Sequence, residues 1–489
     1  MVKELKQRYQ NLTLPVKASI WFVVCGVLKD VIDVLVTPVF TRILTTEQYG
    51  VYNVYNSWFQ IVKIIFTLYL FSEVFNVGLV KFEEERQKFV SSTLGFVTAL
   101  VGIYLVLYLA FCRQINSIIG LPGYLVLLMF AHVLTYVPYY CWIRRERFDY
   151  HYKNVVIVSF LYVILQPMLG IIAILCMDIP VNPGYTRILA AVGVQIIIGA
   201  VLYAEMISRG RTFYSRKYWK YSLKTGIELV PFNLSKVVLN QSDRIMINYF
   251  SGSGDTGIYS VAHSAAFVLQ VVTEALNGAF VPWLYRRLQS GQLSGVKKVV
   301  NSLVVIVAVS AFGIDMIAPE IMKILGSEEY YKGLYCIPAL VCSVYMIFVY
   351  MLFTNVELFY GRNTYVTIAS TIGMLVNLAL NAIFIPIYGF IAAGYTTLIG
   401  YIVMCFGHFV LLRKCLNAEK MKMGDLFDVR VVVLISGLLL IFTSCCGFMY
   451  QWTPVRWIFI MGLVLLAFVN KNKLIGFLRA LKMGAKDNG

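Results

Sequence analysis

Long apolar segments follow one another along nearly the whole chain, and only short polar gaps separate them. A helix needs about 20 mostly apolar residues to cross the hydrocarbon of a bilayer. Fourteen segments reach or approach that length, so we predict an all-α polytopic membrane protein with fourteen transmembrane helices. The predicted spans cover residues 17–38, 51–75, 89–112, 118–142, 154–176, 188–207, 223–250, 257–284, 299–318, 334–360, 364–386, 390–412, 431–450 and 455–470.

Composition also favours a membrane protein. Of the 489 residues, 59% are hydrophobic and 14% are charged, whereas about a quarter of the residues of a soluble protein are charged. The polar gaps are too short for a soluble catalytic domain, and the ten cysteines lack the spacing of a disulfide framework. The net charge of +17 suits loops that face anionic lipid, so we expect membrane lipid and not nucleic acid as a partner.

The positions of lysine and arginine predict the orientation. With the amino terminus inside, the gaps that face the cytoplasm hold 32 of the 42 Lys and Arg residues, and the outside gaps hold 6. Positive residues concentrate on the cytoplasmic side of membrane proteins. We therefore predict a multi-pass protein of the inner (plasma) membrane with both termini in the cytoplasm.

The chain contains an internal repeat. The segments QYGVY at residues 48–52 and DTGIY at residues 255–259 are 207 positions apart, and the same offset relates Lys29 to Lys236. Six spans separate the two copies, so both have the same orientation, as in transporters built from parallel repeats. We predict six-helix bundles over residues 1–210 and 211–415, followed by two further helices and a cytoplasmic tail over residues 416–489.

Local motifs place the chain near one family. The run PVFTRILTTEQYGVY at residues 38–52, Asp243-Arg244, the GIY run at residues 257–259 and Pro282 make the sequence resemble the polysaccharide flippases. These Wzx-type exporters of O-antigen and capsule repeat units are a branch of the multidrug/oligosaccharidyl-lipid/polysaccharide exporter superfamily. The resemblance implies a V-shaped pair of bundles, alternating access, and a polyprenyl pyrophosphate carrying a short oligosaccharide as the ligand. It also admits a polysaccharide polymerase as a partner.

Polar residues inside the predicted spans are the candidates for substrate binding. A charged side chain at bilayer depth costs about 2.5–3.5 kcal/mol and normally faces a bundle interior or a watery cavity. Basic groups would attract pyrophosphate or acidic sugars, and amides would hold sugar hydroxyls; the alternative is that the charges only neutralise nearby carboxylates. The predicted substrate-binding residues are Lys29, Lys63, Lys236, Arg244, Asn233, Asn240, Asn56 and Gln270.

Acidic residues inside the spans are the candidates for coupling to a proton or sodium gradient. We select Asp30, Asp33, Glu274 and Glu357, although the sequence does not choose among them. The four histidines lack metal-ligand spacing, so we expect no metal site and no cofactor.

Three other functions fit the composition less well. A membrane enzyme such as a glycan polymerase needs acid, base or nucleophile groups, and the longest outside gap, residues 319–333, holds three glutamates but no His or Cys. A multidrug exporter of the same superfamily would favour an acidic cavity. An exporter of another lipid-linked precursor, the peptidoglycan flippase, lacks the residue 38–52 signature. We expect a transporter and no catalytic residues.

Overall fold

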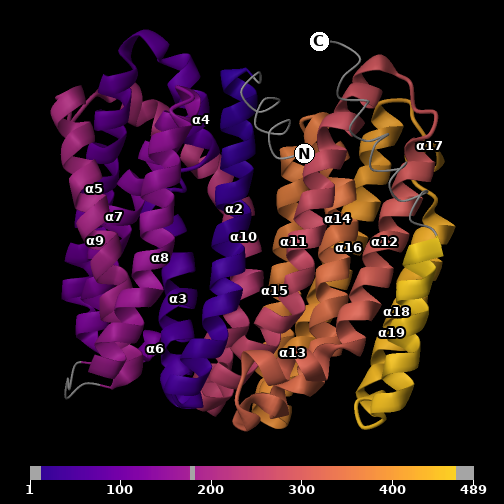
Figure 1. Ribbon diagram of the computed structural model, residues 1–489. Helices are drawn as coiled ribbons and strands as arrows, with labels where there is room; N and C mark the ends of the chain where they lie inside the picture. Colours follow the sequence, from indigo (N-terminus) through magenta and orange to yellow (C-terminus); the bar gives the residue numbers. More distant parts are fainter. Residues whose placement is uncertain (1–12, 177–181, 470–489) are drawn as a thin grey trace, which may run out of the picture. The chain divides into compact units, whose positions relative to one another are not determined.

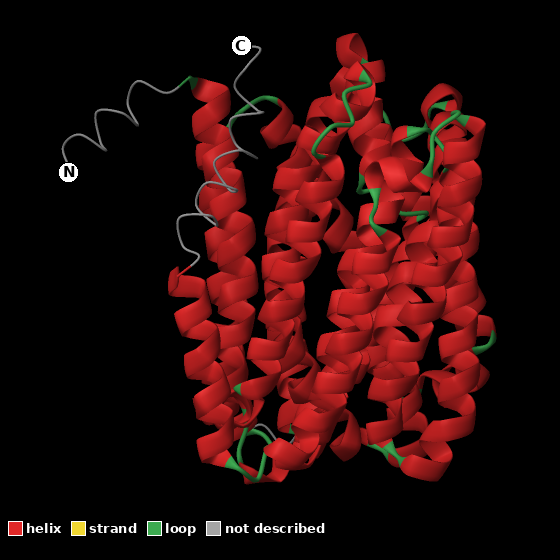
Figure 2. Cartoon of the chain, turned by 90° about the vertical axis from the view of Figure 1, so that its right-hand side faces the viewer, coloured by secondary structure: helices red, strands yellow, loops and turns green. Residues whose placement is uncertain are grey.

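The structure, a computed structural model, describes residues 13–176 and 182–469, and every regular element in them is helical (Figures 1 and 2). The all-α class is therefore confirmed. The chain divides into two compact units, Met1–Val237 (unit 1) and Val238–Gly489 (unit 2). The predicted domain limits at residues 210 and 415 stay predictions.

Unit 1 is built from the helices α2 (Leu14–Ile43), α3 (Thr46–Thr67), α4 (Glu73–Lys81), η1 (Glu83–Glu85), α5 (Arg86–Ala110), α6 (Cys112–Ile119), α7 (Gly123–Phe148), α8 (Tyr152–Cys176) and α9 (Pro183–Gly210). The long helix α10 (Arg216–Ser251) begins in unit 1 and ends in unit 2. Unit 2 continues with α11 (Ser253–Ser290), α12 (Val296–Met316), α13 (Ala318–Leu325), η2 (Glu328–Cys336), α14 (Ile337–Phe359), α15 (Asn363–Tyr388), α16 (Phe390–Ala418), α17 (Met423–Leu426), α18 (Val429–Met449) and α19 (Thr453–Val469).

Ten helices in the described part of the chain are long and apolar enough to cross a membrane. They are α5, α7, α8, α9, α11, α12, α14, α15, α16 and α18. The predicted count of fourteen is therefore not confirmed. Of the other four, α2, α3 and α10 have 30, 22 and 36 residues, and at 1.5 Å per residue even 22 residues reach about 33 Å. These three are long enough to span, and they carry most of the predicted site residues.

Close helix packing forms the core of unit 1. Helix α9 lies against α5, α7 and α8, and α2 lies against α8. A Cβ atom at Gly199 of α9 would lie 2.2 Å from the carbonyl oxygen of Thr135 in α7, so only glycine permits this approach. One turn earlier, Gln195 donates a hydrogen bond to the same carbonyl at 2.9 Å. A close steric fit and a hydrogen bond thus hold α7 and α9 together.

The centre of unit 2 is α14, which contacts α11, α12, α16 and α18 and is buried along nearly its whole length. The helices α18 and α19 pack on α12. Tyr450 donates to the buried Asp315 at 2.6 Å, and Arg456 donates to both carboxylate oxygens of Glu320 at 2.7 and 2.9 Å. These contacts attach the last two described helices to unit 2.

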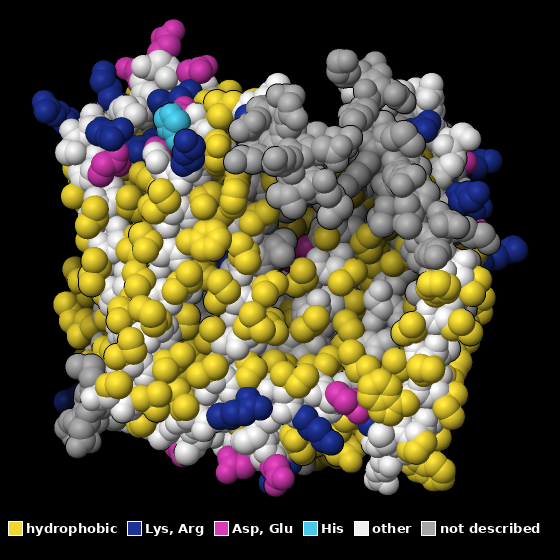
Figure 3. Space-filling view, in the orientation of Figure 1, with side chains coloured by type: hydrophobic (Ala, Val, Ile, Leu, Met, Phe, Trp, Pro, Cys, Tyr) yellow, Lys and Arg dark blue, Asp and Glu magenta, His cyan; other side chains and the backbone are white. Residues whose placement is uncertain are grey.

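The visible surface agrees with a membrane location. Hydrophobic side chains cover the middle of the visible surface, and most charged side chains lie toward its upper and lower edges (Figure 3). Large apolar side chains such as Val106, Ile197 and Phe406 are about two-thirds exposed, which is the arrangement expected where lipid replaces water.

Candidate functional site

Lys63 of α3 lies in an aromatic enclosure within unit 1. Its side chain is 8% exposed, and Nζ donates to Gln60 Oε1 and, at 3.1 Å, to Tyr136 Oη. The ring centroid of Tyr136 is 4.6 Å from the ammonium nitrogen. Gln60 also donates to Asn56 Oδ1 at 3.4 Å. Hydrogen bonds and aromatic faces offset the cost of burying the ammonium group, so two predicted residues belong to one polar chain on α3.

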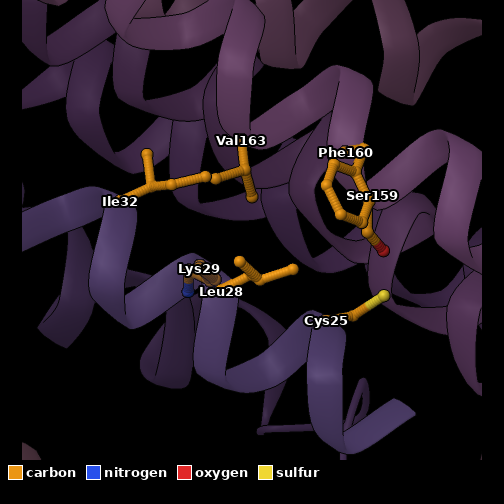
Figure 4. A pocket seen from close by; sticks show the side chains of 7 residues that line it. All are labelled: Cys25, Leu28, Lys29, Ile32, Ser159, Phe160 and Val163. Atoms are coloured by element: carbon orange, nitrogen blue, oxygen red, sulfur yellow. The ribbon is translucent and has the colours of Figure 1, made fainter. Parts of the chain in front are cut away.

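Lys29 and Asp33 are exposed positions on neighbouring turns of α2. Figure 4 shows Lys29 beside Leu28 on the α2 side of a small pocket, with Ser159 and Phe160 of α8 on the other side. Lys29 and Asp33 also line a second pocket, together with Arg187 of α9. The side chain of Asp30 lies outside the described part of the chain.

The predicted polar face of α10 crosses the division between the units. In unit 1, Asn233 donates to the Leu229 carbonyl at 3.0 Å, and Lys236 is exposed with Nζ 5.3 Å from the centroid of the Phe232 ring. These contacts are local to the helix. Each unit therefore holds part of this stripe, and no single described cluster contains all of it.

Arg244 and Asn240 belong to unit 2. Arg244 is buried, and it donates to Ser260 Oγ at 3.2 Å, to Gln241 Oε1 at 3.2 Å and to the Asn240 carbonyl at 3.3 Å. Asn240 Oδ1 accepts from Gln241 Nε2 at 2.9 Å. The guanidinium thus donates to three neutral oxygen atoms on α10 and α11.

Asp243 directly precedes Arg244 in the sequence, and its carboxylate is buried, with the residue 1% exposed. Its carboxylate accepts hydrogen bonds from Tyr259 Oη at 2.6 Å, Thr397 Oγ1 at 2.6 Å and Asn381 Nδ2 at 2.7 Å. Asn377 donates to the same threonine at 3.2 Å. Four helices, α10, α11, α15 and α16, thereby bring a carboxylate, amides and hydroxyls together. Such oxygen donors suit a proton or a hard cation such as Na⁺.

The other predicted acids of unit 2 have separate surroundings. Glu274 of α11 is exposed and accepts from Gln270 Nε2 at 2.6 Å. Glu357 of α14 is fully buried and lies 2.7 Å from Nδ1 of the equally buried His408 of α16. In the described ranges no three His, Cys, Asp or Glu side chains gather as a metal site.

Sequence reasoning missed several polar residues of these clusters. Asn377 and Asn381 are one turn apart in the apolar helix α15, and His408 lies in the apolar helix α16. A polar residue within an apolar span was the available signal. Arg187 is assigned by hydropathy to an outside gap, but the structure places it in the second turn of α9.

A known protein family matches the part of the chain that holds most of these polar residues. Residues 16–288, more than half of the chain, match the model of the family described as polysaccharide biosynthesis protein. The chain belongs to this family. The predicted resemblance is therefore confirmed: the protein is a multi-pass membrane protein of a family described by its part in polysaccharide biosynthesis.

Individual relatives are distant. The chain is 28% identical over 167 residues to Lsg locus putative protein 1 of Haemophilus influenzae, which covers 32% of this chain and 40% of that protein. It is 24% identical over 245 residues to the uncharacterized membrane protein MJ1068 of Methanocaldococcus jannaschii, which covers 48% of each. The chain thus spans less than half the length of these curated relatives.

Solved structures share the fold. The lipid II flippase MurJ in an inward closed conformation superposes with a TM-score of 0.64 at 14% identity, over 93% of this chain and all of that one. An inward-facing multidrug resistance transporter of the MATE family gives a TM-score of 0.58 at 12% identity, over 80% of this chain and 95% of that one. At such identities the likeness concerns the fold alone.

Proposed function

We propose that the protein flips a polyprenyl-pyrophosphate-linked oligosaccharide across the cytoplasmic membrane by alternating access, for the synthesis of a surface polysaccharide. The family match over residues 16–288 carries this proposal, because it includes α3, α10 and nearly all of α2. These long helices hold Lys29, Lys63, Lys236 and Arg244, and cations at membrane depth suit an anionic cargo.

The rest of the proposed ligand is a glycan attached to a lipid. The amides of Asn56, Asn233, Asn240 and Gln270 are the groups that would bind sugar hydroxyls. Their present partners are helix carbonyls and neighbouring side chains, which sugar hydroxyls could replace with hydrogen bonds of similar strength. A multidrug exporter would need a site for cations, and the four basic residues oppose that alternative.

Export against a gradient needs a coupling ion. Asp30, Asp33, Glu274 and Glu357 remain proposed carriers. We add Asp243, whose carboxylate has three hydrogen-bond donors within 2.7 Å. Protonation or cation binding would change the charge beside Arg244 while these donors keep the carboxylate in place. The bias of Lys and Arg between the gaps supports cytoplasmic termini.

A reconstituted assay tests the proposal. Vesicles would contain undecaprenyl pyrophosphate carrying a fluorescent disaccharide, and a membrane-impermeant quencher would report the label that reaches the outer leaflet. We expect vesicles with the protein to expose the label much faster than protein-free vesicles. Equal rates would refute the flippase function. Faster movement of the cationic dye ethidium, with no movement of the labelled lipid, would favour a multidrug exporter instead.

A further inference from the structure

Arg187 of α9 is held in an unusual way within unit 1. It is 8% exposed, and its guanidinium carbon lies 3.6 Å from the ring centroid of Phe40 in α2 and 3.6 Å from that of Tyr52 in α3. The Nη1 atom is buried and has no hydrogen-bond partner among the described residues. Aromatic faces stabilise the charge, but they leave unused a donor whose burial is costly.

The same arginine borders a pocket that contains further polar groups. Lys29 and Asp33 of α2 and Gln166 of α8 line this pocket together with Arg187 and Tyr52, and its volume is about 70 Å³. A cavity of about 10–15 Å³ already admits one water molecule, so this space holds a small polyatomic group. Two cations and one carboxylate leave a net charge of one positive unit.

We propose that this pocket binds one phosphate group of an anionic lipid during transport, with Arg187 as the principal ligand. This inference rests on the proposed flippase function and assigns the diphosphate of its cargo to a place in unit 1. A guanidinium fork binds phosphate oxygens with directed, charge-assisted hydrogen bonds. The stacked rings hold the plane of the fork, and the unpartnered Nη1 supplies a donor.

Lys29 and Asp33 determine how strongly the pocket holds an anion. Lys29 adds a second positive charge, whereas Asp33 reduces the total, and a transport site must bind its cargo weakly enough to release it. The Lys and Arg bias predicts that α9 begins on the outer side. The pocket would therefore receive phosphate in the later half of the transport cycle.

Binding of inorganic pyrophosphate to the purified full chain in phosphatidylcholine nanodiscs tests this site. Titration calorimetry at constant ionic strength would compare the wild type with Arg187→Gln and Arg187→Lys. The matched control is Arg42→Gln, because Arg42 is an exposed arginine of α2 that does not line the pocket. We expect at least a tenfold weaker Kd for Arg187→Gln, a smaller loss for Arg187→Lys and no change for the control.

Equal Kd values for Arg187→Gln and the wild type, or an equal loss in Arg42→Gln, would overturn the proposal. If Arg187→Gln does not elute as a monodisperse protein, Lys29→Gln replaces it, with a weaker Kd expected. A second arm replaces pyrophosphate with phosphatidylglycerol in the nanodisc. If phosphatidylglycerol stabilises the wild-type protein but not Arg187→Gln, the pocket binds the phosphate of bilayer headgroups.

The flipping assay separates this inference from the proposed function. Flipping without pyrophosphate binding would refute the pocket and leave the flippase function intact. Pyrophosphate binding that depends on Arg187, without flipping of the labelled lipid, would refute the flippase function and leave the phosphate site.

Discussion

Removing the Asp243 carboxylate should strongly destabilise unit 2. Tyr259, Thr397 and Asn381 donate to this carboxylate at 2.6–2.7 Å, and Asp243→Ala would leave all three donors without their acceptor. Each unsatisfied buried polar group costs about 1–3 kcal/mol. Because repacking and water entry recover part of the sum, we expect the free energy of unfolding to fall by about 3–5 kcal/mol, as for other broken buried charge networks. Asp243→Asn keeps an oxygen acceptor and should cost less.

A double-mutant cycle measures this interaction. Tyr259→Phe alone removes a hydrogen bond to a charged group, worth about 1.5–3 kcal/mol, but in the Asp243→Ala background it only removes a hydroxyl that has lost its acceptor. The two changes should therefore be non-additive by at least about 1 kcal/mol. Unfolding of the detergent-purified protein by dodecyl sulfate, followed by tryptophan fluorescence, would give each free energy.

The control for this cycle is Glu329→Gln, since Glu329 is an exposed carboxylate of η2. We expect this variant to unfold within about 0.5 kcal/mol of the wild type. The reasoning would be refuted if Asp243→Ala unfolded like this control, or if the Asp243 and Tyr259 changes were additive within about 0.5 kcal/mol.

Three further predictions concern topology, transport and pH. In a chain without native cysteines, Glu328→Cys should react with an impermeant maleimide on intact cells and Arg216→Cys only after permeabilisation; the reverse would contradict the predicted orientation. Lys29→Ala or Lys236→Ala should slow flipping about tenfold, or about 1.4 kcal/mol, at normal protein levels, and arginine should partly restore it; wild-type rates in both Ala variants would make the lysines structural. Burial raises the pKa of Glu320, but hydrogen bonds from its partner arginine on α19 and from its own backbone outweigh this and lower the pKa below its usual value. The contribution of this ionised carboxylate to the stability of the fold is therefore complete above about pH 4.3 and is lost as pH falls through the lowered pKa. Glu320→Gln should thus reduce the acid-induced fall of Tm. An unchanged dependence of Tm on pH would show that the Glu320–Arg456 pair adds no stability.

Much of the fold could be predicted because its signals are local. Hydropathy identifies a membrane-spanning helix from about 20 neighbouring residues, and the TTEQ run at residues 45–48 forms a capping box that begins α3. The number of transmembrane spans is uncertain for the same reason, because hydropathy is also judged from neighbouring residues. The polar side chains that make α2, α3 and α10 candidates for function also make them less apolar than ordinary spans.

The candidate site was less predictable because its partners come from different helices. A helical period shows that Asp243 shares a face of α10 with Asn240, but it cannot show that Asn381 and Thr397 meet the carboxylate from α15 and α16. Likewise, nothing near Glu357 in the sequence indicates His408. These contacts depend on helix packing, so sequence could supply candidates without pairing them.

Two equivalent tyrosines show how far the repeat can differ in chemistry. The 207-residue offset relates Tyr52 to Tyr259. The ring of Tyr52 lies 3.6 Å from the guanidinium carbon of Arg187 in unit 1, whereas the hydroxyl of Tyr259 donates to the carboxylate of Asp243 in unit 2. A tyrosine offers a π-face to a cation and a hydroxyl to an anion, so one residue type serves both surroundings. Unit 1 thereby has a buried arginine between two aromatic rings and unit 2 a buried carboxylate with three hydrogen-bond donors, a difference in chemistry that sequence equivalence alone would conceal.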